Sequence, residues 1–210
     1  SKSVEHGIKA LLDLQHPDGY WCFELEADAT IPAEYVIMMH YLDEVEVELQ
    51  NKIGVYLRDH QLPEGGWPLY LGGEGNISCT VKVYYALKLI GDNPEESHMK
   101  KARDAIHSLG GAARSNVFTR ITLALFEQIP WRGVPCLPVE CMLLPRWFPF
   151  HLLKISYWSR TVMVPLLILY HYKPKAKNPR KVSIPELFLT PPDQEKNYFP
   201  VRSPLNYAFF

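Results

Sequence analysis

Hydrophobic positions recur at helical spacing through most of this chain. Residues 4–12 are apolar at i, i+4, i+7 and i+8, and residues 49–57 repeat that spacing. Such a period places the apolar side chains on one face of a helix. A further helix is predicted near residues 78–90, where Gly91 can end it. The pattern therefore indicates a chain built from amphipathic helices.

Helix boundary signals continue this pattern toward the C-terminus. Residues 93–96 read Asn-Pro-Glu-Glu, which predicts a cap at Asn93, a helix starting at Pro94 and a stop at residues 110–111. Ser115 or Asn116 can open the next helix, and an apolar helix is expected over about 157–172. No convincing series of strands is found. We therefore predict an all-α chain of helix hairpins joined by Gly/Pro turns.

One phrase, Q-x-x-x-G-x-W, occurs twice, each time after a helical pattern. The copies start 61 − 15 = 46 residues apart, a spacing typical of a repeated helix–turn unit. Glycine can take the positive φ of a tight turn, so the tryptophan can fold back on its helix while the glutamine bonds loose helix-end groups. We interpret the phrase mainly as a structural clamp, with ligand contact as the alternative. Its residues are Gln15, Gly19 and Trp21 in the first copy and Gln61, Gly65 and Trp67 in the second.

Composition excludes several classes of function. The net charge of −1 over 210 residues argues against a nucleic-acid surface. The four cysteines are scattered without zinc-site spacing, and the eight histidines form no ligand cluster, so no metal is expected. Residues 130–158 are rich in proline and aromatics, and residues 173–204 are polar and proline-rich, which predicts an extended surface segment or linker.

The repeated phrase resembles the QW motif of the squalene–hopene cyclase and oxidosqualene cyclase family. The stretches EADATIPAEYV, GGWPLY, PWRGVP and LPRWFPFHLLKISYWSRTVMVPLL are similar to the N-terminal third of a bacterial squalene–hopene cyclase. The resemblance implies α/α barrels and cyclisation of squalene to hopene or hopanol by protonation and a carbocation cascade, without a cofactor. The family's proton donor is an Asp in a D-x-D-D motif, which this sequence does not contain. We therefore expect a fragment or truncated form that is inactive alone.

The resemblance also implies a division of the chain. Residues 1–30 would form an N-terminal helix and first QW repeat that pack with the catalytic barrel. Residues 31–172 would form an incomplete α/α barrel, the one without the acid. Residues 173–210 would form an extended linker and, from residue 203, the start of a further helix.

Four residues match functional positions of the family. Trp158 matches an aromatic residue lining the cyclisation cavity, where a ring face stabilises a cation. Ile155 and Met163 match positions along the apolar substrate channel, and Glu34 matches a residue of the water network where the last cation is deprotonated. Each has a plainer alternative: core packing for the first three, and an exposed or helix-end carboxylate for Glu34.

Two positions near Glu34 depart from the family pattern. Lys82 stands where an acid is expected and Asn116 where an arginine is expected. The polar network is therefore expected to be wired differently in this chain.

The expected partners follow from the same resemblance. They are squalene, together with the rest of the enzyme, and a monotopic contact with the cytoplasmic side of a bacterial cell membrane; a homodimer is compatible with the family. Within residues 142–170, aromatic rings beside Arg146 and Lys154 suit a membrane interface, although a buried core is the alternative for most of this stretch.

Two other classes of function compete with the cyclase. One is a non-enzymatic α/α-barrel module for binding or interaction. The other is a prenyl-substrate enzyme with a related barrel, which would require Asp, Cys and His zinc ligands that we do not find.

Overall fold

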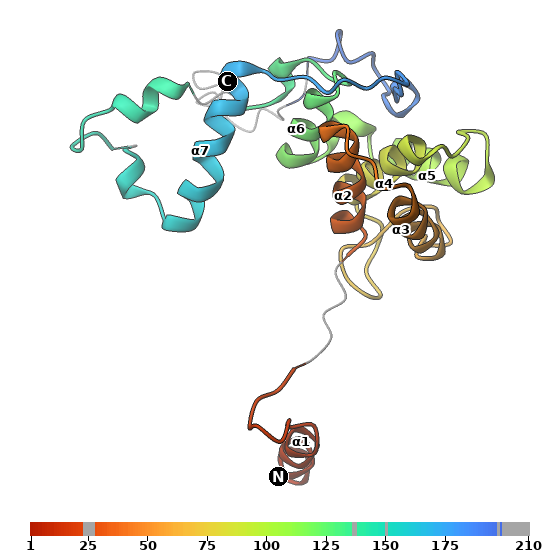
Figure 1. Cartoon of the computed structure of the whole chain (residues 1–210), viewed down its shortest axis with the longest axis vertical. Helices are drawn as coiled ribbons and strands as arrows, with labels where there is room; N and C mark the ends of the chain where they lie inside the picture. The colour runs from red at the N-terminus through yellow and green to blue at the C-terminus, as the bar shows by residue number, and fades with distance from the viewer. Residues whose placement is uncertain (23–27, 136–137, 150, 197, 199–210) are drawn as a thin grey trace.

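A computed structural model describes residues 1–22, 28–135, 138–149, 151–196 and 198 (Figure 1). Across these residues the secondary structure is helical and contains no strand, which confirms the all-α prediction. The α-helices are α1 (Lys2–Asp13), α2 (Thr30–Leu42), α3 (Val47–Asp59), α4 (Ile77–Ile90), α5 (Ser97–Ser108), α6 (Val117–Leu125) and α7 (Tyr157–Tyr172). Short 3₁₀ helices are η1 (Ala112–Arg114), η2 (Trp131–Gly133), η3 (Val139–Leu143), η4 (Leu152–Lys154) and η5 (Pro185–Leu187).

Helix α4 is the centre of the helical body. Helices α2, α3, α5 and α6 all contact it, and every residue over 78–87 is buried. Asn76 begins this helix by accepting hydrogen bonds from the backbone N–H groups of Ser78 and Cys79. Gly91, at φ 132°, follows its last residue. Because α4 is surrounded on all sides, its polar side chains are buried along with the apolar ones.

Two helices differ from the sequence prediction. Helix α2 was not predicted, because its own apolar residues are distributed all around the helix and do not form a single apolar face. Helix α5 begins at Ser97 instead of Pro94. The expected capping bonds do form, since Asn93 N–H donates to Glu96 Oε1 (3.1 Å) and Glu95 N–H donates to Asn93 Oδ1 (2.9 Å), but they close a turn that precedes the helix.

Helix α1 lies apart from the rest of the chain (Figure 1). None of its residues is buried. Residues 4–12 therefore form the predicted helix with an apolar face, and this face is exposed to solvent.

The segment after α7, residues 174–196, packs on the body as a strap. It is extended and lies close to the surface, but Ile184 and Leu187 are fully buried. Glu186 accepts hydrogen bonds from Tyr84 Oη and Lys88 Nζ of α4. The strap is thus anchored to α4 by these hydrogen bonds. The helix start expected from residue 203 lies outside the described residues.

None of the described helices is both long enough and apolar enough to cross a bilayer.

Candidate functional site

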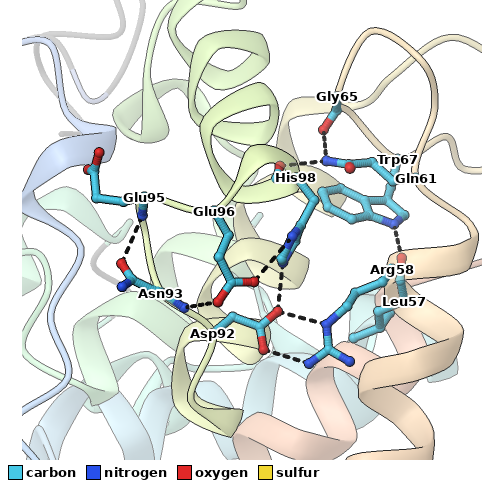
Figure 2. Close-up of polar contacts among 10 residues, drawn as sticks. All are labelled: Leu57, Arg58, Gln61, Gly65, Trp67, Asp92, Asn93, Glu95, Glu96 and His98. Carbon is cyan, nitrogen blue, oxygen red and sulfur yellow. Dashed lines mark hydrogen bonds and ion pairs between the residues drawn. The ribbon is translucent and has the colours of Figure 1, made fainter.

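The second copy of the repeated phrase forms a hydrogen-bonded clamp between α3 and α5 (Figure 2). Gly65 takes φ 96°, and Gln61 Nε2 donates to its carbonyl at 2.9 Å. The same amide donates to the carbonyl of His98 on α5, also at 2.9 Å. The indole N–H of Trp67 donates to the carbonyl of Leu57, in the last turn of α3, at 2.8 Å. One turn therefore ties its own helix to a neighbouring helix.

The first copy has the same internal geometry. Gly19 takes φ 89°, Gln15 Nε2 donates to the Gly19 carbonyl at 2.8 Å, and Trp21 Nε1 donates to the Leu11 carbonyl at 2.7 Å. In both copies the tryptophan bonds the helix-end carbonyl and the glutamine bonds the glycine carbonyl. This differs from the expectation that the glutamine would bond the helix end.

A charged cluster lies directly beside the second clamp (Figure 2). Arg58 grips the buried Asp92 with two bonds, Nε to Oδ2 at 2.9 Å and Nη2 to Oδ1 at 2.5 Å. His98 Nε2 approaches Asp92 Oδ2 at 2.7 Å. Burial raises the pKa of Asp92, but the bonds from Arg58 and His98 outweigh it, so the pKa lies below its ordinary value.

No sequence pattern predicts this cluster, whose members come from α3, α5 and the turn between α4 and α5. Asp92, Glu96 and His98 bring three potential metal-ligand atoms within 4.8 Å of one another. However, the Arg58 cation already occupies both oxygens of Asp92, and a second cation there would be repelled. The arrangement is that of a structural ion-pair network joining α3 to the turn before α5.

Glu34 lies on the wall of an apolar groove of about 470 Å³ between α2, α6 and α7. Among the described residues it is the only charged side chain that lines the groove. Its Oε1 accepts a hydrogen bond from Lys82 Nζ of α4 at 2.6 Å. The Lys82 side chain is 6% exposed and that of Glu34 is 40% exposed. The apolar lining comes from Ile31, Tyr35, Ile37, Met38, Tyr41, Phe118, Ile121, Leu125, Phe126 and Leu166.

Two other residues close to this pair, Cys79 and Asn116, have different roles. Burial raises the pKa of the Cys79 thiol to about 11, so the thiol stays protonated at neutral pH. Asn116 caps α6 by accepting from Thr119 N–H at 2.9 Å, and its own N–H donates to Ser78 Oγ at 2.8 Å. Of the two unusual positions, Lys82 therefore contacts Glu34, while the Asn116 amide is used by the helix start.

The other three predicted site residues lie on or just before α7. Trp158 is 76% exposed, and Ile155 and Met163 are half-buried. None of the three lines the groove that holds Glu34. The described structure thus brings Glu34 and Lys82 together and does not place Trp158, Ile155 or Met163 in their groove.

Comparisons with known proteins agree with this architecture. A family model described as the squalene-hopene cyclase N-terminal domain matches residues 4–209. Squalene–hopene cyclase of Bradyrhizobium diazoefficiens is 56% identical over 90% of this chain, and that of Zymomonas mobilis is 54% identical over 89%. Squalene–hopene cyclase of Alicyclobacillus acidocaldarius is 37% identical over 90%.

These matches cover only part of each relative. They correspond to 29%, 28% and 30% of the lengths of the three relatives, respectively. The matched part includes the helical body, both clamps and the strap. The helical fold, the repeated turn and the match over nearly the whole chain show that it belongs to the squalene–hopene cyclase family, in the part described as the N-terminal domain.

Proposed function

We propose that this chain supplies the N-terminal part of an enzyme that cyclises squalene to hopene or hopanol. The match of residues 4–209 to the family's N-terminal domain carries this proposal. In the proposed reaction, a carboxylic acid protonates a terminal double bond, and the resulting cation is passed along the chain as rings close. The final cation either loses a proton, giving an alkene, or captures water and then loses a proton, giving an alcohol.

Glu34 is proposed to act through water at the end of this cascade. A carboxylate can polarise a water molecule that accepts the departing proton. The location of Glu34 supports this role, because among the described residues it is the one charged side chain that lines this mostly apolar groove. An apolar groove suits a hydrocarbon substrate. One oriented carboxylate can hold the water molecule that accepts the proton in the last step.

Trp158 is proposed to line the cyclisation cavity. A cation over an indole face gains about 0.5–2 kcal/mol, so several rings are needed to guide a cascade. The exposure of Trp158 in this chain leaves its ring free to face a further part of the enzyme. Ile155 and Met163, half-buried nearby in sequence, are proposed to line the apolar route by which squalene enters.

Membrane contact is proposed for the region around η3 and η4. Leu143, Trp147 and Leu153 are exposed there, and Lys154 Nζ donates to the Trp147 carbonyl. Exposed rings beside a cation suit the headgroup level of a bilayer. We propose a monotopic association with the cytoplasmic side of the bacterial membrane, compatible with a homodimer.

Helix α1 and the first clamp are proposed to pack against the catalytic barrel. The exposed apolar face of α1 supports this division, since it has no partner among the described residues. Residues 31–172 would then be the barrel without the acid, and residues 173–210 would connect it onward.

The proposal is tested by squalene conversion. A longer polypeptide, extended past Phe210 and containing a D-x-D-D motif, should produce cyclic products detectable by gas chromatography. The 210-residue chain should produce none, because it lacks the proton donor. Turnover by the short chain, or failure of the longer one to convert squalene, would contradict the proposal.

A further inference from the structure

We infer that Lys82 is a positioning residue that fixes the carboxylate of Glu34 at the groove wall. The inference rests on the proposed role of Glu34 and adds to it the group that controls this side chain. Three features of the pair carry it: the burial of Lys82, its contact with Glu34, and the location of Glu34 at the groove.

The first feature is a buried cation on the most enclosed helix. Lys82 lies in the fully buried stretch of α4, and its side chain is only 6% exposed. A buried ammonium is costly unless an anion and a hydrogen bond compensate it. Within the described part of the chain, Glu34 is its one hydrogen-bond partner. The pairing with Glu34 is therefore what allows a lysine at this position.

The second feature is the contact itself, which joins residues from two different helices. Lys82 is held by the packing around α4, whereas Glu34 on α2 is partly exposed. Because its lysine partner is held in the core, the bond at 2.6 Å fixes Oε1 of Glu34 at one point. The other oxygen, Oε2, has no protein partner among the described residues. The third feature is the location of Glu34 at the groove wall, where this oxygen remains for a water molecule or substrate.

A second lysine–glutamate pair in the same chain provides a matched control. Lys52 and Glu48 on α3 are also 2.6 Å apart, but their side chains are 70% and 80% exposed. Water competes for both charges there, and such surface pairs contribute little. The control has the same chemistry and the same distance without the burial or the groove.

The test measures the ratio of alkene to alcohol products in the longer, squalene-converting enzyme. The variants are Lys82→Met, Lys82→Arg, Glu34→Gln, the double variant Lys82→Met/Glu34→Gln, and Lys52→Met as control. Lys82→Met and Glu34→Gln should shift the product ratio in the same direction, each by about threefold or more. The double variant should shift it no further than Glu34→Gln alone, because the residues act as a unit. Lys82→Arg should retain the wild-type ratio, and so should Lys52→Met.

The outcomes separate positioning from plain stability. A merely structural lysine would lower the amount of folded enzyme in Lys82→Met and leave the product ratio unchanged, which would overturn the inference. If Lys82→Met does not fold, the swap variant Glu34→Lys/Lys82→Glu replaces it. The swap moves the carboxylate from α2 to α4 and should shift the product ratio. A wild-type ratio in the swap would show that the position of the carboxylate does not matter and would overturn the inference. An altered ratio in Glu34→Gln with no change in Lys82→Met refutes only Lys82, whereas an unchanged ratio in Glu34→Gln refutes the proposed role of Glu34 as well.

Discussion

The two copies of the repeated phrase have the same hydrogen bonds but very different surroundings. In each, the glutamine amide holds the glycine carbonyl, and the tryptophan indole bonds a helix-end carbonyl ten residues earlier. Yet Trp67 is 0% exposed and Trp21 is 43% exposed. The second copy also bonds to α5 through Gln61, and the backbone N–H of Trp67 donates to Thr80 Oγ1 of α4 at 3.1 Å.

The comparison shows that the turn is defined locally, whereas its stabilising effect comes from what it packs against. A hydrogen bond contributes only about 0.5–1.5 kcal/mol net, and a buried indole contributes considerably more through the area it removes from water. The second copy therefore joins three helices, and the first copy is a formed turn on an exposed helix. Variants at equivalent positions of the two copies test this difference.

The largest expected difference is between the tryptophans. Trp67→Ala should lower the free energy of unfolding by about 3–5 kcal/mol, because it leaves a cavity inside the body and frees the Leu57 carbonyl. Trp21→Ala should change it by less than about 1 kcal/mol, since that ring is partly exposed already. Urea unfolding followed by circular dichroism measures both, and equal losses in the two variants would contradict the comparison.

The glycines give the next largest difference. A Cβ on Gly65 would lie 2.3 Å from the Lys101 carbonyl oxygen of α5, whereas a Cβ on Gly19 meets nothing within 4 Å. Both residues have positive φ, which costs an alanine about 1–2 kcal/mol. Gly65→Ala should therefore cost about 3 kcal/mol once the backbone contact is included, and Gly19→Ala only the conformational part. Thermal unfolding should place the Gly65→Ala midpoint well below that of Gly19→Ala; the reverse order would be inconsistent with the packing described.

A third difference concerns the carboxylates beside the clamps. Asp92→Asn removes a buried partner of Arg58 and His98 and should lower stability by about 1–3 kcal/mol at pH 7, a range that allows for the partial exposure of Arg58. The exposed Asp18, which lies 3.4 Å from His16, provides the control, and Asp18→Asn should have little effect.

The Asp92 effect should also depend on pH in one direction. Its pKa is lowered below the ordinary value of 3.8, so the folded state binds this proton less readily than the unfolded state. The stabilisation is present above the ordinary value and is lost as pH falls through the lowered one. The difference in the free energy of unfolding between wild type and Asp92→Asn should persist at pH 6 and shrink below about pH 4. A difference that grows as the pH falls would contradict the lowered pKa of Asp92.

The smallest expected difference is between the glutamines. Gln61→Ala removes two hydrogen bonds, one of them to α5, and should cost about 1–2 kcal/mol. Gln15→Ala removes one exposed bond and should cost about 0.5 kcal/mol or less. Chemical denaturation of both variants decides this, and a larger loss for Gln15→Ala would reverse the comparison.

Local patterns predicted much of this fold. The apolar face of α1, the Asn116 cap and the extent of α7 follow from periodicity and capping residues that act over a few neighbours. The unpredicted α2 shows the limit of that approach, because a helix that is apolar all round has no face to detect. The start of α5 shows another limit, since the capping bonds of Asn93 were read correctly but the chain uses them to close a turn.

Contacts between distant residues could not be predicted from the sequence. Lys82 and Glu34 were each singled out, but their pairing depends on how α2 packs on α4. Arg58, Asp92 and His98 come together only when α3 and α5 are assembled. The strap appears polar in sequence, and only the burial of Ile184 and Leu187 reveals that it is anchored.

The central claim is that the first clamp packs against a further part of the enzyme, as the second clamp packs against α4 and α5. Hydrogen exchange at the two indole N–H groups tests this claim most directly. It should be measured by NMR in the 210-residue chain and in the longer cyclase polypeptide. The account predicts that Trp67 is strongly protected in both, while Trp21 exchanges rapidly in the short chain and at least a hundredfold more slowly in the longer one. Equal exchange of Trp21 in the two forms would contradict the proposed packing of α1 against the rest of the enzyme.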